Sequence, residues 1–308
     1  MINFRYHVVS LTAVFLALAI GVVVGTAALN GPIADKLQDQ VDGLSKDNSN
    51  YRAKANSFQE ELNRSEEFVT ELAPALLTGK LTGRKIVVVV LPSGKDYAEG
   101  VTKMLTVAGA TITGRVTVQD KFLDPANGFE LSDLAVKASR PTVSIDGLPL
   151  NVDGVETSSA LLARALLLKT PDPVAEQDLT VVLSAYTTPG YLGAGEDLVP
   201  GAEATVVVSG PPPVDRDAGK KNKNAVTLAT QFSKNRPLVV AGTNIGEGNL
   251  VSEVRADATL VKTVSTVDNA STAQGQLATA LAVVERLAAG KVGQYGLDGV
   301  SRVPKAAS

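Results

Sequence analysis

The chain has few of the side chains that perform nucleophilic or metal-dependent chemistry. It contains no cysteine, one histidine (His7) and two methionines (Met1 and Met104). Without cysteine and with one histidine, the sequence excludes thiol catalysis, a Ser-His-Asp arrangement and zinc sites built from Cys or His. The carboxylates form no obvious pair. We therefore predict no catalytic residue, no resident metal and no cofactor.

Two loops that follow predicted strands are of the kind that can bind a phosphate. Residues 91–96 (LPSGKD) open a predicted helix, and helix N-termini attract anions. Residues 242–248 (GTNIGEG) follow another predicted strand. Neither loop has the glycine spacing of a dinucleotide or Walker fingerprint. Plain turns between strand and helix are the favoured interpretation of both.

The charge balance argues against a nucleic-acid partner. The chain has 29 Lys and Arg against 32 Asp and Glu, and only 4% of its residues are aromatic. Nucleic-acid binding depends on concentrated basic charge and is often helped by stacking aromatic rings. We expect no nucleic acid to bind. The lack of cysteine is compatible with export but does not assign a compartment.

The first element is an apolar segment at residues 8–29, which carries no charge. A helix of this length is roughly 33 Å long and matches the ~30 Å hydrocarbon core of a lipid bilayer. The apolar part of a cleaved signal peptide is shorter, about 7–15 residues. An uncleaved signal anchor is therefore favoured over a cleaved signal, and a buried core helix is a distant third interpretation.

The charges around this segment predict its orientation. Arg5 and the terminal amine precede the apolar run, while Asp35, Lys36 and Asp39 follow it. This is a weak positive-inside bias, which places residues 1–7 in the cytoplasm. The bulk of the chain then lies outside the cytoplasm, anchored in the plasma (inner) membrane. In this arrangement His7 lies at the lipid headgroups and is not expected to be a ligand.

Residues 33–77 predict a coiled coil. Their apolar positions alternate in steps of four and three over more than five heptads. Asn48 occupies an a position, which favours two in-register strands at some loss of stability. We favour a parallel homodimer, because both copies leave the same membrane in the same direction. An intramolecular hairpin and a helix packed on the globular domain are the alternatives. The predicted interface consists of Leu37, Val41, Leu44, Asn48, Tyr51, Ala55, Phe58, Leu62, Val69 and Leu72.

Residues 83–290 predict one α/β globular domain. Apolar, β-branched runs typical of buried strands alternate with helical patterns, which indicates a Rossmann-like, doubly wound and mostly parallel sheet. Residues 211–224 are polar and predict an exposed loop, and residues 291–308 predict a loosely ordered tail. The predicted strands are 85–91, 110–118, 204–209, 237–242 and 262–267, and the predicted helices are 96–108, 158–168, 173–185, 224–233 and 272–289.

Three stretches of the chain are recognisable as motifs: residues 1–25 (MINFRYHVVSLTAVFLALAIGVVVG), 265–269 (STVDN) and 293–296 (GQYG). They resemble the MctB family of actinobacteria, which is labelled as copper transport and sometimes as an outer-membrane channel. The first block is the most specific, and the resemblance covers essentially the whole chain. Within the family the chain is most similar to the corynebacterial SteB cell-division proteins. That resemblance implies a SteA-like membrane partner and control of cell-wall hydrolysis.

The residues favour one of these two functions. Cu(I) prefers soft sulfur ligands, and the chain offers only His7, Met1 and Met104 as Cys, His or Met ligands. One apolar helix cannot line a channel alone, and a transmembrane barrel needs alternating strands. We therefore expect a non-enzymatic, membrane-anchored dimeric scaffold of cell division and cell-wall remodelling. A copper transport component of the envelope is the alternative. A third possibility is an envelope enzyme or small-ligand receptor that uses the carboxyl ends of the strands.

Overall fold

The chain divides into two compact units, Met1–Ser65 and Glu66–Ser308. The computed structural model describes residues 4–29, 32–139, 143, 147–150, 153–167, 174–193, 195, 198–234, 236–243 and 246–304. Parts of several predictions lie outside these residues, namely positions 1–3, 30–31, 168, 173, 244–245 and 305–308.

The first unit contains helix α1 (Phe4–Leu29) and most of helix α2 (Pro32–Leu77). The stretch Phe4–Ala27 of α1 is long and apolar enough to cross a membrane, with a mean hydropathy of 2.6, and none of it is buried in protein. Large apolar side chains such as Phe15 and Val23 are therefore exposed on every side of α1. A helix that is apolar all round needs an apolar surrounding, which lipid provides.

The last turns of α2 belong to the second unit and pack into its core. Ala73 and Leu77 are buried, and Val69 is partly buried against the same cluster. The Glu66 carboxylate accepts a hydrogen bond of 2.5 Å from the backbone N–H of Ala273, at the start of helix α11 (Ala273–Ala289). The first N–H groups of a helix lack partners within the helix and favour a negative charge. The end of α2, from Glu66 onward, is thus part of the second unit and of its core.

The core of the second unit is a parallel sheet of six strands in the order β2-β1-β3-β4-β5-β6. This confirms the predicted parallel α/β fold. Strands β2 and β3 flank β1 on opposite sides, so the direction of strand addition reverses between β1 and β3. In doubly wound sheets such a switch point lies where ligands commonly bind. The strands are β1 (Lys85–Val90), β2 (Thr111–Thr117), β3 (Ala204–Val208), β4 (Leu238–Ala241), β5 (Val264–Val267) and β6 (Gln294–Tyr295).

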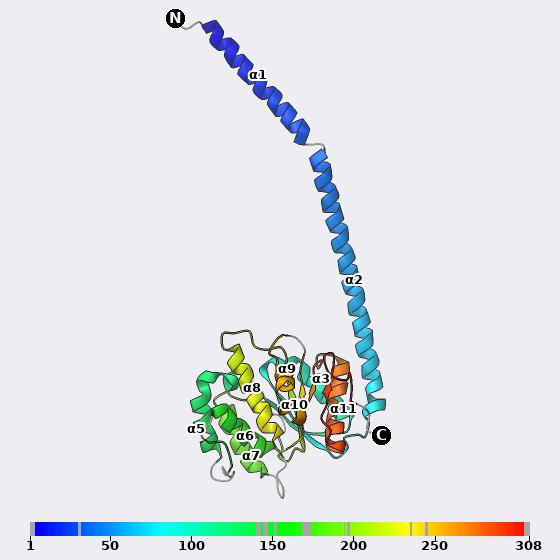
Figure 1. Cartoon of the computed structure of the whole chain (residues 1–308), viewed down its shortest axis with the longest axis vertical. Helices are drawn as coiled ribbons and strands as arrows, with labels where there is room; N and C mark the ends of the chain where they lie inside the picture. Colours follow the sequence, from blue (N-terminus) through cyan, green and yellow to red (C-terminus); the bar gives the residue numbers. More distant parts are fainter. Residues whose placement is uncertain are drawn as a thin grey trace. The chain divides into compact units, whose positions relative to one another are not determined.

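Helices cover both faces of this sheet (Figure 1). Val87 and Val89 of β1 point into one apolar cluster, and Ile86, Val88 and Val90 point into the other. The second cluster is covered by the end of α2, by α3 (Lys95–Val107) and by α11. The first is covered by α4 (Asp120–Leu123), α5 (Gly128–Ala138), α6 (Gly154–Leu166), α7 (Glu176–Thr187), α8 (Ala218–Ser233), α9 (Leu250–Ala256) and α10 (Leu260–Thr263).

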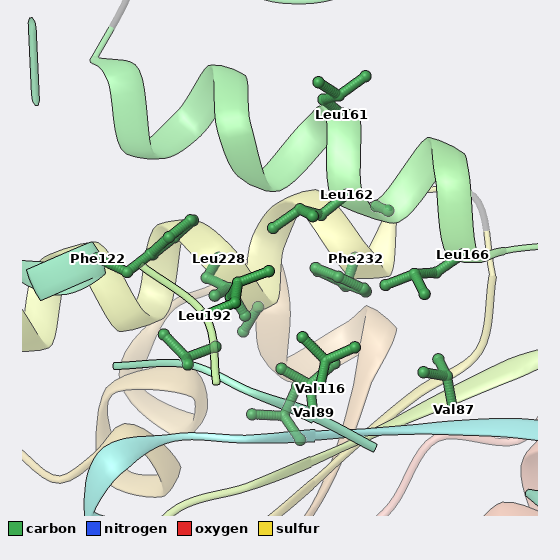
Figure 2. Packing of buried hydrophobic residues seen from close by; sticks show 14 of the residues in the cluster. Val87, Val89, Val116, Phe122, Leu161, Leu162, Leu166, Leu192, Leu228 and Phe232 are labelled. Atoms are coloured by element: carbon green, nitrogen blue, oxygen red, sulfur yellow. The ribbon is translucent and has the colours of Figure 1, made fainter. Parts of the chain in front are cut away.

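Burial on both faces explains why the strands are apolar without interruption. A strand with one solvated face alternates apolar and polar residues, whereas β1 reads KIVVVV. Figure 2 shows Leu162 and Leu166 of α6 and Phe232 of α8 above Val87 and Val89. The side chains of these helices fill the space over the sheet and fix the positions of the loops at its carboxyl edge.

Two segments are more ordered than the sequence predicted. Residues 211–224 were expected to form an exposed loop, but α8 begins at Ala218. Asn224 is buried, and its side chain donates a 2.8 Å hydrogen bond to the carbonyl of Leu123. Within the predicted tail, Gln294–Tyr295 pairs with β5 as β6. Both segments are held by contacts from distant parts of the chain, which local composition does not reveal.

Candidate functional site

The predicted seam of the coiled coil is open to solvent in the single chain. Within Met1–Ser65, the six large apolar seam residues are 56–71% exposed, and Asn48 and Ala55 are exposed as well. An exposed apolar stripe on a helix is typical of a surface that binds another apolar surface. The predicted homodimer would cover it, and the dimer stays a prediction. The six residues are Leu37, Val41, Leu44, Tyr51, Phe58 and Leu62.

The two last interface residues lie in the second unit and differ from each other. Val69 is partly buried against the core of its own chain, whereas Leu72 is 39% exposed. The face of α2 that packs on the domain is formed by Glu66, Val69, Ala73 and Leu77. Any seam therefore has to end near the point where α2 enters the domain.

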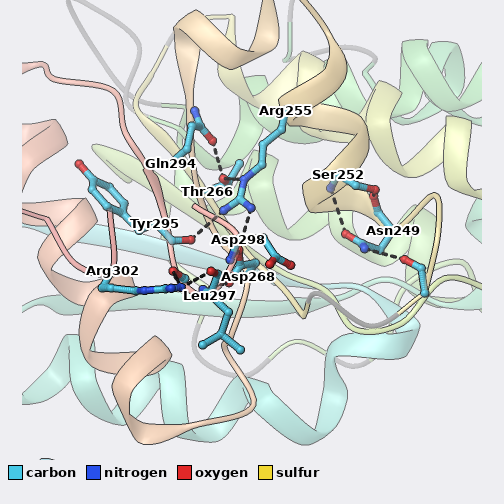
Figure 3. Close-up of polar contacts among 12 residues, drawn as sticks. Asn249, Ser252, Arg255, Thr266, Asp268, Gln294, Tyr295, Leu297, Asp298 and Arg302 are labelled. Carbon is cyan, nitrogen blue, oxygen red and sulfur yellow. Dashed lines mark hydrogen bonds and ion pairs between the residues drawn. The ribbon is translucent and has the colours of Figure 1, made fainter. Parts of the chain in front are cut away.

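A buried polar cluster lies at the carboxyl edge of the sheet (Figure 3). Arg255 of α9 donates from Nε to Thr266 Oγ1 at 2.8 Å and from Nη1 to Asp268 Oδ2 at 2.7 Å. Its third nitrogen, Nη2, donates to the backbone carbonyl of Tyr295 at 2.7 Å. The guanidinium thus ties α9, β5 and β6 together. We refer to Arg255, Thr266, Asp268 and Tyr295 as the Arg255 cluster.

Asp268 is the centre of this cluster and is only 1% exposed. Besides Arg255, it accepts hydrogen bonds from the backbone N–H groups of Leu297 at 2.6 Å and Asp298 at 2.9 Å. A side chain at Gly296 would collide with the Asp268 carboxylate, and Gly296 adopts a positive φ of 114°. Each nitrogen of the guanidinium donates one hydrogen bond, and both oxygens of the carboxylate accept from protein groups. This arrangement is that of a structural clasp.

Two sequence motifs supply residues of the clasp. Residues 265–269 (STVDN) supply β5 and Asp268, and residues 293–296 (GQYG) supply β6 and the tight approach at Gly296. The sequence alone links these motifs only through a family resemblance, and nothing in the sequence around Arg255 indicates that it joins them. A motif with an aspartate directly after a buried strand was the one clue to a buried acidic group.

A second buried carboxylate, Glu285 of α11, lies on the other side of β6. The Tyr295 hydroxyl donates to Glu285 Oε2, and Lys291 Nζ donates to Oε1 at 2.8 Å. Burial, together with the Glu285 carboxylate, raises the pKa of Tyr295 above its ordinary value. The phenol therefore stays protonated and holds β6 against α11.

The loop at residues 91–96 lies at the switch point between β1 and β3. Pro92–Gly94 forms one 3₁₀ turn after β1, and Ser93 Oγ accepts a 3.0 Å hydrogen bond from the N–H of Gly210, which follows β3. A pocket of about 300 Å³ opens at this junction and is lined by both loops. The turn was predicted, but the pocket depends on the strand order and was not.

The described residues contain no group of three or more His, Cys, Asp or Glu placed to hold a metal ion. Met104 is 3% exposed and packs in the core cluster beneath α3. His7 lies on α1, in the unit that carries the apolar helix. The sulfur of Met104 thus serves as core packing.

Comparison with known proteins identifies the family. The family described as "Copper transport outer membrane protein, MctB" matches residues 1–303. A relative from Mycobacterium tuberculosis (strain H37Rv), named "Copper transporter MctB", is 28% identical over 305 residues, which cover 96% of each chain. A relative of the same name from Mycobacterium leprae is 29% identical over 308 residues, again covering 96% of each chain. The chain therefore belongs to the MctB family, whose members are named as membrane transport proteins.

Proposed function

We propose that this protein is a non-enzymatic scaffold or regulator of the cell envelope, anchored in the plasma membrane as a parallel homodimer. In this proposal α1 spans the bilayer with its N-terminus in the cytoplasm, and the α/β domain lies outside. The observation that carries the proposal is the exposed heptad stripe on a helix that continues into the domain core. Such a helix can fix both the oligomeric state and the placement of the domain it carries.

The proposed partner is a SteA-like membrane protein, and the proposed process is cell division with control of cell-wall hydrolysis. Support for this partner and this process comes from the resemblance to the SteB proteins. A scaffold role is compatible with the buried charges of the domain, because the Arg255 cluster and Glu285 are bound to other protein groups. The arrangement suits recruitment and positioning more than catalysis.

The dimer can be tested with single cysteines, because the natural chain has none. In a parallel, in-register pair each seam residue lies opposite its own copy, within reach of a disulfide. We expect Leu37→Cys, Leu44→Cys, Tyr51→Cys and Phe58→Cys each to give a disulfide-linked dimer when membranes are mildly oxidised.

The matched control is Ala53→Cys, which lies on the opposite side of the same helix and is exposed like the seam residues. It should remain monomeric under the same oxidation. Cross-linking at one seam position alone would indicate an antiparallel pair, and equal cross-linking at Ala53→Cys would indicate random collision. Either result contradicts the proposed dimer.

A second candidate function is copper transport, because the curated relatives are named copper transporters. The chain has one histidine, two methionines and no cysteine, which is a poor ligand set for Cu(I). If the protein acts in copper tolerance, the ligand set favours an indirect role through the envelope or a metal carried by a partner.

A further inference from the structure

The pocket at the switch point between β1 and β3 has features of a binding site for a small molecule. Its volume of about 300 Å³ is at the lower end of the range for ligand pockets, roughly 300–1,000 Å³. Its walls are mainly apolar, from Leu123, Leu250, Ala225 and the three prolines 211–213. A small ligand with an apolar body fits such walls.

Two glycines allow a close approach of the two loops beside the pocket. A side chain at Gly94 would collide with the backbone carbonyl of Val208, and one at Gly210 would collide with that of Ser93. The turn after β1 and the loop after β3 therefore approach each other more closely than any other residue would allow. The hydrogen bond from the Gly210 N–H to Ser93 Oγ locks them together.

The charges at the pocket select the sign of the ligand. Lys221 Nζ lies 2.5 Å from Asp215 Oδ2, and this hydrogen bond raises the pKa of Lys221 and lowers that of Asp215. The lysine is thus already neutralised. Asp120 also lines the pocket, and its carboxylate acts on the same Lys221, more weakly than that of Asp215. Two carboxylates thus act on one lysine at the pocket. The surplus charge is negative, which disfavours phosphates and carboxylates.

One residue that lines the pocket has a buried hydroxyl without a partner. Ser209 follows β3, is 2% exposed and lines the pocket. Its Oγ has no hydrogen-bond partner among the described residues. Buried polar groups without partners are uncommon in native structures, and at binding sites a ligand can provide the missing bond.

We propose that this pocket binds a small organic amine, with the apolar body between the prolines and Leu123, the ammonium group at Asp120, and a hydrogen bond to Ser209. The binding does not depend on the scaffold function or on the partner. It gives the α/β domain a ligand-recognition role of its own.

The test uses the cysteine-free chain again. Val214 lines the mouth of the pocket and is 99% exposed, so Val214→Cys places a thiol beside it. The full-length protein in detergent is equilibrated with the symmetrical disulfides of three thiols in the presence of 2-mercaptoethanol: 4-(aminomethyl)benzyl mercaptan, 4-(mercaptomethyl)benzoic acid and cysteamine. In each exchange the introduced thiolate bonds to one sulfur of the disulfide, and the other sulfur leaves as a free thiol. Intact-mass spectrometry measures the fraction of each mixed disulfide. We expect the aromatic amine to be captured at about fivefold lower concentration than either of the others.

Variants and a second thiol site separate pocket binding from other causes. Asp120→Asn should remove the preference over the carboxylate, whereas Asp133→Asn, an exposed aspartate of α5, should keep it. Ser209→Ala should weaken capture of the aromatic amine, whereas Ser159→Ala, which removes another buried and unpartnered hydroxyl, should not. Val300→Cys, at a position 94% exposed, should show no preference.

Three outcomes would overturn the proposal. Equal capture of the aromatic amine and the aromatic carboxylate would show that Asp120 does not select charge. Equal capture of cysteamine and the aromatic amine would show that the positive charge alone explains capture, without binding to the apolar walls. A preference that survives Asp120→Asn would place the selecting group elsewhere.

Discussion

At the scale of single residues, the second unit depends on buried charges that are fully paired. Arg255 and Asp268 join α9, β5 and β6, and the Asp268 carboxylate is almost completely shielded from water. Removing one partner from a buried ion pair costs about 3–5 kcal/mol, because the other charge is left uncompensated. Exposed pairs contribute far less, about 0–1 kcal/mol. Whether an ion pair is buried or exposed therefore decides how much its loss lowers the free energy of unfolding.

We therefore expect Arg255→Ala to lower the free energy of unfolding by about 3 kcal/mol. The low end of the range applies because Asp268 keeps its two backbone N–H donors. The matched control is Lys137→Ala, which removes an exposed pair with Asp133 in the same unit and should cost less than about 0.5 kcal/mol. Urea unfolding followed by circular dichroism measures both variants. Equal destabilisation would contradict the clasp.

Tyr295 makes stability sensitive to alkaline pH. Its folded-state pKa is raised by burial and by Glu285, while an unfolded tyrosine ionises near pH 10. Above that pH the unfolded state binds fewer protons than the folded state, so stability falls as pH rises. Below about pH 10 the contribution of the buried phenol is fully present. Burial raises the pKa of Tyr186 and Tyr191 in the same direction.

The Tyr295→Phe variant isolates the contribution of the Tyr295 phenol to this pH dependence of stability. At pH 7 the variant should lose about 1 kcal/mol, because the hydrogen bond to Glu285 is gone. Between pH 9 and 11 its free energy of unfolding should fall less steeply than that of the natural protein, since one titrating group has been removed. Urea titrations at several pH values measure the slope. An unchanged slope would show that Tyr295 does not titrate as its surroundings indicate.

At the scale of elements, the long helix α2 has two different faces along its length. Near its end, Ala73 and Leu77 are buried in the domain, whereas Leu44 and Tyr51 are exposed. The exposed part is the one that the proposed dimer would cover, whereas the buried part already packs against the domain. The polar a-position residue Asn48 matters only if that partner is a second helix in register, which makes it a sensitive probe of the dimer.

Asn48→Leu should stabilise the dimer by about 2 kcal/mol, because a polar side chain in the seam is replaced by an apolar one. It should also loosen the oligomeric state, since the buried amide no longer specifies two strands. Thermal unfolding and sedimentation of the detergent-solubilised protein measure these effects. Ala53→Leu, on the opposite side of the helix, is the control. A similar gain in both variants would show that helix propensity alone is at work.

Elements determined by a local pattern could be predicted from the sequence, whereas elements held by contacts between distant residues could not. The strand KIVVVV was predictable because burial on both faces leaves an uninterrupted apolar run. The first turns of α8 and the two residues of β6 were not, because they are held by distant groups such as the Leu123 carbonyl and Arg255. The pocket depends on β1 lying beside β3, and strand order is a property of the whole domain.

At the scale of the whole molecule, the two candidate functions make opposite demands on the residues. A direct copper carrier needs soft ligands, whereas a scaffold needs a seam, an anchor and a domain. The chain has an exposed apolar stripe on α2 and an apolar helix α1, and its one internal methionine, Met104, is buried in the core. Met104→Leu keeps the packing and removes the sulfur. If this chain does not bind copper directly, cells with this variant should have the same copper tolerance as cells with the natural chain.

A deletion strain decides between the candidates. It would be grown across a copper titration while its septa and its sensitivity to cell-wall antibiotics are scored. The scaffold proposal predicts aberrant septa and antibiotic sensitivity at unchanged copper tolerance, because loss of an anchored dimer misplaces its partner without altering metal flux. Complementation with the natural chain should restore both traits, and the Met104→Leu chain should restore them equally. Copper hypersensitivity with normal septa would instead reverse the order of the two candidates. Rescue by Met104→Leu would then direct the search to a metal-carrying partner, since the chain would have lost the one sulfur that is buried in the described residues.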